Sequence, residues 1–110
     1  MSKDDYFVIV YEVLKYLYTR LKQGKRPDVE QLTATFYLIP ESYWGYIIAS
    51  LVDEGYITGV SLVQTVEGRQ IDDMSGVAIT PKGIQYLFDN RLFEKAKKTL
   101  KDIGNQGMMF

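Results

Sequence analysis

The sequence predicts an α+β fold of the winged-helix type, because two short segments place a β-hairpin between two helices. Residues 53–57, Asp-Glu-Gly-Tyr-Ile, are typical of a helix end followed by a strand. Residues 79–83, Ile-Thr-Pro-Lys-Gly, are typical of a returning strand followed by a helix. With three helices predicted ahead of them, the order is α-α-α-β-β-α-α. This is a winged helix with a small antiparallel hairpin wing and an extra C-terminal helix.

The first helix is predicted over residues 4–22, where apolar side chains recur at the spacing of one helical face. They are Phe7, Val10, Tyr11, Leu14, Leu17, Tyr18 and Leu21. A second apolar stripe on the same helix consists of Tyr6, Ile9, Val13 and Tyr16. A helix that is apolar on two faces is either packed inside its own domain or shared with another subunit. We therefore weigh burial of this stripe against the last helix of the chain and an interface with a second copy or another protein.

The second and third helices are bounded by residues that favour helix ends. Asp28 is expected to cap a short second helix over residues 28–35. Pro40 suits the start of the third helix, which is predicted over residues 40–54. Gly55 then supplies the left-handed residue that ends many helices.

The second half of the chain begins with the hairpin. A strand rich in β-branched residues is predicted over 56–66, a loop over 67–73, and a returning strand over 77–79. Thr80 is expected to cap the next helix, and Asn90 to begin the last one.

Length and composition fit one domain. The chain has 110 residues, of which 46% are hydrophobic and 25% charged, as in ordinary globular proteins. We expect a single winged-helix domain over residues 1–110, with its core over about 5–103 and a flexible tail over 104–110.

Several classes of function are disfavoured by composition. The net charge of -1 provides no overall attraction to phosphate. Because the chain has neither Cys nor His, it lacks disulfides, thiol nucleophiles, most zinc ligands and the usual general base. No spacing sets a nucleophile beside a base, and no glycine-rich phosphate loop is present. We therefore expect no enzyme, no cofactor, no metal and no small-molecule substrate.

The location of the protein is also predicted from the sequence. No apolar run approaches the length of a membrane span, and the acidic start is unlike a signal peptide. We expect a cytoplasmic protein that does not bind a membrane.

Three blocks of this sequence resemble the YjcQ family, small winged-helix proteins of Gram-positive bacteria and their phages. They are residues 51–60 (Leu-Val-Asp-Glu-Gly-Tyr-Ile-Thr-Gly-Val), 79–87 (Ile-Thr-Pro-Lys-Gly-Ile-Gln-Tyr-Leu) and 95–103 (Lys-Ala-Lys-Lys-Thr-Leu-Lys-Asp-Ile). The resemblance covers roughly residues 6–103. It implies the fold and a prophage association, but no established activity, so it assigns no functional residue. The first helix and the wing loop are longer here than in the family pattern.

The third helix would be the recognition helix of a DNA-binding winged helix. Its outward face is predicted to hold Ser42, Tyr46, Ala49, Ser50 and Asp53, with Tyr43 at the edge. No Lys or Arg occurs in this helix, and base reading normally uses Arg, Lys, Asn or Gln. The alternative is a structural helix with a polar outer face.

The cations lie elsewhere in the sequence. Arg69 is near the tip of the hairpin, where it either enters a minor groove or belongs to a solvated acidic loop. Two basic clusters are Arg20, Lys22, Lys25 and Arg26, and Arg91, Lys95, Lys97, Lys98 and Lys101. They either form solvated helix surfaces or contact phosphates without sequence preference.

Two hypotheses of function follow. The first is a DNA-associated transcriptional regulator of phage or prophage origin that binds double-stranded DNA. Its candidate contacts are Ser42 and Tyr46 near the groove, with Lys25, Arg26, Arg69, Lys97, Lys98 and Lys101 at phosphates. The second is a protein-protein interaction module of the same origin whose recognition helix does not read DNA. Its candidate interface, for a homodimer or a protein partner, is Tyr6, Ile9, Val13 and Tyr16.

Overall fold

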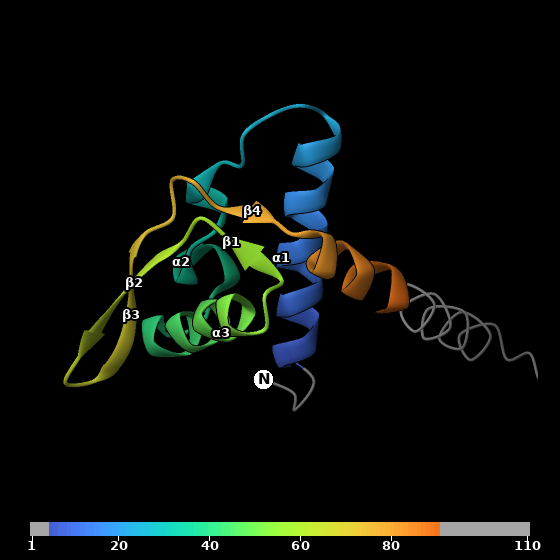
Figure 1. The fold of residues 1–110 in the computed structure, drawn as a ribbon. Helices are drawn as coiled ribbons and strands as arrows, with labels where there is room; N and C mark the ends of the chain where they lie inside the picture. The colour runs from blue at the N-terminus through green and yellow to red at the C-terminus, as the bar shows by residue number, and fades with distance from the viewer. Residues whose placement is uncertain (1–4, 91–110) are drawn as a thin grey trace, which may run out of the picture.

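The computed structural model of the chain describes residues 5–90. Its elements up to the hairpin are α1 (Asp5–Lys22), the 3-10 helix η1 (Val29–Gln31), α2 (Ala34–Tyr37) and α3 (Glu41–Asp53). They are followed by β1 (Ile57–Thr58), β2 (Ser61–Thr65), β3 (Gly68–Asp73), β4 (Ala78–Ile79) and a helix over residues 81–90. The predicted α+β class is confirmed, and the arrangement in Figure 1 is compatible with a winged-helix-like fold.

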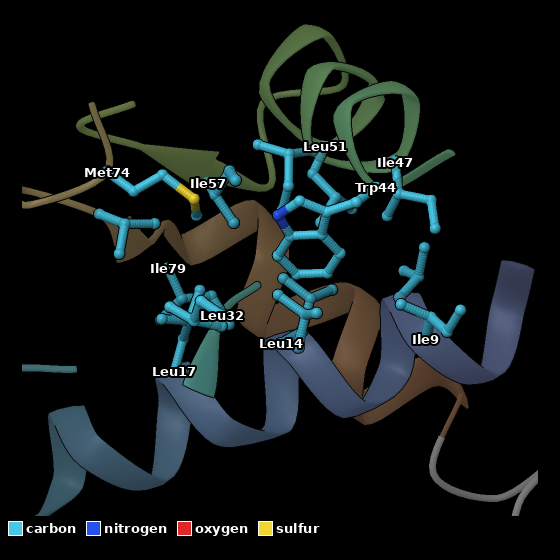
Figure 2. Packing of buried hydrophobic residues seen from close by; sticks show 14 of the residues in the cluster. Ile9, Leu14, Leu17, Leu32, Trp44, Ile47, Leu51, Ile57, Met74 and Ile79 are labelled. Carbon is cyan, nitrogen blue, oxygen red and sulfur yellow. The ribbon is translucent and has the colours of Figure 1, made fainter. Parts of the chain in front are cut away.

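The core lies between α1, α3 and the strands β1 and β4. Val13, Leu14 and Leu17 of α1 are fully buried, and Figure 2 shows Leu14 directly beneath the indole of Trp44 from α3. The two stripes predicted on α1 form one wide buried face, because Ile9 and Val13 lie in the same cluster as Val10, Leu14 and Leu17. Helix α1 ends at its predicted residue, whereas its predicted first residue, at position 4, lies outside the described residues. The helix has one apolar face and not two.

The segment predicted as the second helix is divided into two short turns. A carboxylate oxygen of Asp28 accepts the Glu30 N–H at 3.0 Å, as the cap prediction requires, but the turn that it starts is only η1. Thr33 is extended (φ -133°, ψ 159°), and its hydroxyl accepts the Phe36 N–H at 3.0 Å. The single helix predicted over 28–35 is wrong, because Thr33 begins a second cap and the chain restarts as α2.

Helix α2 is fixed to α3 by an aromatic contact. The rings of Tyr37 and Trp44 are stacked, with centroids 5.2 Å apart and planes 19° from parallel. Burial, together with the nearby charge of Glu12, raises the pKa of Tyr37 to about 12. The Tyr37 hydroxyl therefore stays protonated at neutral pH and acts as a packing group.

Helix α3 and the helix over residues 81–90 begin and end close to where the sequence predicts. Gly55 follows α3 with φ +79°, the left-handed conformation expected of it. The Thr80 hydroxyl accepts the Gly83 N–H at 3.1 Å and donates to the Gly55 carbonyl oxygen. One threonine thus caps the later helix and connects it to the end of α3.

The wing differs from its prediction. The segment predicted as a loop over 67–73 is mostly strand β3, which pairs antiparallel with β2. A second two-stranded sheet, β1 with β4, continues the ribbon toward the core. The two sheets are separated at Gly59 and Gly76, where a Cβ on Gly59 would lie only 1.9 Å from the Gly76 carbonyl oxygen. Both faces of the ribbon are partly exposed to water, so polar side chains occur on both sides of β3. The sequence of β3 therefore lacks the alternation of apolar and polar residues by which a strand is predicted.

The helix over residues 81–90 includes Asn90, so the predicted start of a new helix at Asn90 is not observed. The Asn90 side-chain amide donates to the Tyr86 carbonyl oxygen at 2.8 Å, a contact within one continuous helix. The rest of the predicted last helix and the tail over 104–110 lie outside the described residues.

Candidate functional site

The wing is packed along the side of α3 that was expected to face DNA. Gly45, Ala49 and Asp53 are spaced by four residues, so they form one line on the helix surface. A Cβ on Gly45 would lie 3.5 Å from the Arg69 carbonyl oxygen, which places β3 directly beside the helix. Ala49 is only 3% exposed, so its predicted position on an outward face is wrong. The small residues Gly45 and Ala49 let β3 approach α3 closely.

Arg69 closes this contact through its side chain. Its Nη1 donates to Oδ1 of Asp53 at 2.9 Å, and its Nη2 donates to Oδ2 of the same carboxylate. The hydrogen bond from Arg69 holds the pKa of Asp53 below its ordinary value, and the same contact raises the pKa of Arg69. Arg69 is the one basic residue between positions 57 and 79, so the wing has no unpaired cation to offer a phosphate.

The remaining outer side of α3 is aromatic. The Tyr6 and Ser50 hydroxyl oxygens are 3.0 Å apart, and the ring of Tyr6 lies 6.3 Å from Tyr46 and 5.2 Å from Phe7. Tyr46 is 65% exposed and Phe7 is 62% exposed. We call Tyr6, Phe7, Tyr46 and Ser50 the aromatic face. Sequence reasoning missed it because Phe7 fits the helical spacing of the core residues.

An open groove of about 330 Å³ lies between the start of α3 and β3. It is lined by Glu41, Ser42, Trp44, Gly45, Glu67, Arg69, Gln70 and Ile71. Since Arg69 is paired with Asp53, the unpaired charges of this lining are the carboxylates of Glu41 and Glu67. Ser42 therefore lies in acidic surroundings that repel phosphate.

The predicted phosphate contacts are not brought together with α3. Lys25 and Arg26 lie in the loop after α1, which is at the opposite end of the molecule from α3 in Figure 1. Arg20 donates from Nε and Nη2 to the Arg26 carbonyl oxygen at 2.9 and 2.7 Å, which fixes this basic turn. Lys97, Lys98 and Lys101 lie outside the described residues.

The predicted interface stripe is largely internal. Ile9 is 6% exposed and Val13 is fully buried, so neither is available to a second subunit in this structure. The Tyr16 hydroxyl accepts the Asp28 N–H at 2.7 Å and thereby ties α1 to the loop before η1. Ile9 and Val13 are buried in the core cluster with Trp44 of α3, whereas the last helix, which was the expected cover for this stripe, lies outside the described residues. Tyr6 belongs to the aromatic face.

The comparisons with known proteins give one match. The family model described as YjcQ protein matches residues 11–105. No curated protein and no solved structure matches the chain. Within residues 5–90, none of the helices combines the length and the hydropathy needed to cross a bilayer.

Proposed function

The chain belongs to the YjcQ family, and from this premise we propose that it is a non-enzymatic protein-interaction module whose third helix does not read DNA. One observation carries the proposal. The outer side of α3 offers aromatic rings and carboxylates without a free cation, since Arg69 is bound by Asp53. A DNA-binding surface needs Lys or Arg near phosphates, because phosphate contacts supply most of the non-specific affinity. A phage or prophage origin, implied by the resemblance, is part of this proposal.

The aromatic face has the composition of a protein-binding surface. Tyr and other large rings supply much of the binding energy at protein interfaces, because they bury a large area with few rotatable bonds. Tyr46 and Phe7 are both well exposed, and the Tyr6 hydroxyl is held toward Ser50. Glu54, at the end of α3, is also exposed. We therefore propose a partner protein with an apolar centre and Lys or Arg at its rim.

Site-specific cross-linking tests this proposal. A photoreactive amino acid at Tyr46 should capture one defined protein in the cells that produce this chain. The same group at Gln85, exposed on the helix over 81–90, should not capture it.

The captured protein should then be purified and its affinity measured. Phe7→Ala should weaken binding at least about tenfold, as expected of an interface anchor. Phe36→Ala is the matched control, because Phe36 is a similarly exposed ring on α2. Equal effects of the two substitutions would refute the assignment to the aromatic face.

A second candidate function is the DNA-associated regulator. The observation that favours it is the basic segment at the end of α1 and in the turn that follows, where Lys22, Lys25 and Arg26 are all exposed. Such a turn could contact phosphates without reading bases. Binding to a generic duplex at low and moderate salt measures this directly. Tight, strongly salt-dependent binding that Lys25→Ala and Arg26→Ala together weaken would support the regulator.

A further inference from the structure

One edge of the β2–β3 ribbon is covered, and the other is free. Strand β3 lies next to α3 (Figure 1). Apart from atoms of α3 that are close to Gly45 in sequence, the one atom within 4 Å of a Cβ built on Gly45 is the Arg69 carbonyl oxygen. This carbonyl therefore points toward α3 and away from β2. Within residues 5–90, β2 pairs with β3 and with no other strand.

The direction of the Arg69 carbonyl fixes the direction of the backbone groups on β2. Gln64 lies opposite Arg69 in the register. In an antiparallel pair, opposite residues either exchange both hydrogen bonds or turn their N–H and C=O groups outward, and the two kinds alternate. Gln64 is thus of the outward kind, and so is Leu62, two residues before it. Val63, opposite Gln70, uses its backbone groups inside the ribbon.

The free edge of β2 lacks two of the usual protections against pairing, which are charged side chains and proline. Exposed edge strands normally carry charges or proline, which discourage the addition of another strand. The sequence of β2 is Ser-Leu-Val-Gln-Thr, with neither, whereas β3 contains Arg69, Asp72 and Asp73. Val63 is 41% exposed, and Val66 in the following turn is fully exposed. The uncharged strand is the one whose edge is open.

We propose that β2 is a self-association site, at which the edge of β2 pairs antiparallel with β2 of a second copy of this chain. With Val63 opposite Val63, Leu62 of each copy lies opposite Gln64 of the other. The outward backbone groups of Leu62 and Gln64 then meet, as the ladder requires. A second copy fits this edge because an uncharged strand that pairs with itself sets no like charges opposite each other, and the central pair is apolar.

The result is a continuous antiparallel sheet across two copies, related by a two-fold axis at Val63. This pairing does not rest on the proposed function, because it leaves the aromatic face unused. The edges of two five-residue strands bury far less than the ~1,200–2,000 Å² of a stable interface. The dimer should therefore be weak, and it should form as the protein concentration rises.

Sedimentation velocity of the full chain from about 10 µM to about 1 mM provides the test. The native chain should shift from monomer to dimer across this range. Val63→Lys should weaken association about tenfold, because two ammonium groups replace the central apolar pair. Val63→Glu should do the same, and an equimolar mixture of the two variants should associate again through opposite charges. A native chain that stays monomeric throughout, or a mixture that does not associate, would overturn the proposal.

Gln64→Pro is an independent second variant. The Gln64 N–H points away from β3, so proline removes the outward donor without removing a hydrogen bond of the ribbon. Gln64→Thr is its matched control, because it keeps the donor and loses the same side chain. The proline variant should lose association and the threonine variant should keep it, with native circular dichroism in both. Equal association of the two variants would refute pairing through this edge.

Discussion

The guanidinium of Arg69 on β3 and the carboxylate of Asp53 at the end of α3 form a two-point ion pair across sixteen residues of sequence. The pair joins β3 to the side of α3 that also carries Gly45 and Ala49. It also neutralises the wing's one cation. The same contact therefore helps to hold the hairpin against α3 and leaves this side of the molecule poorly suited to phosphate.

The first prediction concerns the pKa of Asp53. In the native protein its carboxyl should titrate below the ordinary value of about 4, and Arg69→Gln should return the pKa toward that value. Carboxyl chemical shifts followed by NMR through the acid range measure this. Asp73 is the internal control, because hydrogen bonds from Ser75 and not from Arg69 lower its pKa. If Arg69→Gln changed the pKa of Asp73 as much as that of Asp53, the substitution would have disturbed the fold as a whole and not this ion pair alone.

The second prediction is the pH dependence of stability that follows from this pair. Because folding lowers the pKa of Asp53, the pair stabilises the protein above the pKa of the unfolded carboxyl, about 4. The stability gap between the native chain and Arg69→Gln should be constant near neutral pH. It should shrink as the pH falls through the lowered pKa of Asp53. Urea unfolding at a series of pH values checks this, and a gap that does not shrink in acid would contradict the assignment.

The third prediction concerns the stripe on α1. Val13→Lys should unfold the protein, because an unpaired buried ammonium costs several kcal/mol out of a total stability of about 5–15 kcal/mol. Phe7→Lys should leave the fold intact, because Phe7 is largely exposed on the same helix. Thermal melts followed by circular dichroism distinguish the two. A folded Val13→Lys variant would show that this residue is not a core position.

The fourth prediction tests the joint between the two sheets of the wing. Gly59→Ala should cost at least roughly 2 kcal/mol, because the new methyl group would meet the Gly76 carbonyl oxygen in a left-handed conformation. Gly24→Ala should cost only about 1 kcal/mol, since Gly24 is also left-handed but has open space around it. Urea denaturation of both variants isolates the steric part. Equal losses would mean that the close approach of Gly59 and Gly76 is unimportant.

Helix boundaries were predicted well where a cap or a glycine defines them. The end of α1, the bounds of α3, the cap at Thr80 and the left-handed Gly55 all depend on local chemistry that the sequence displays. The second helix was predicted wrongly because Thr33 can be a helical residue or a cap, and packing decides between them. Strand β3 was missed because its polar side chains hide the period of a strand with two partly exposed faces.

The candidate site was less predictable than the fold. The absence of cations in α3 is visible in the sequence, but the ion pair of Asp53 with Arg69 depends on how β3 packs against α3. The aromatic face joins Tyr6 and Phe7 to Tyr46, about forty residues away, which only tertiary packing can bring together. The spacing of Phe7 fits the core, yet its side chain lies beyond the edge of the buried face.

The central claim is that the outer side of α3 is not a DNA-reading surface. The most direct measurement is a titration of the ¹⁵N-labelled full chain with a generic DNA duplex at low salt, followed through its backbone amides. The amides of Ser42, Tyr46 and Arg69 should not shift, and any binding should perturb only the basic turn within residues 5–90. Saturable shifts along α3 and β3 would contradict the account and restore the recognition-helix interpretation.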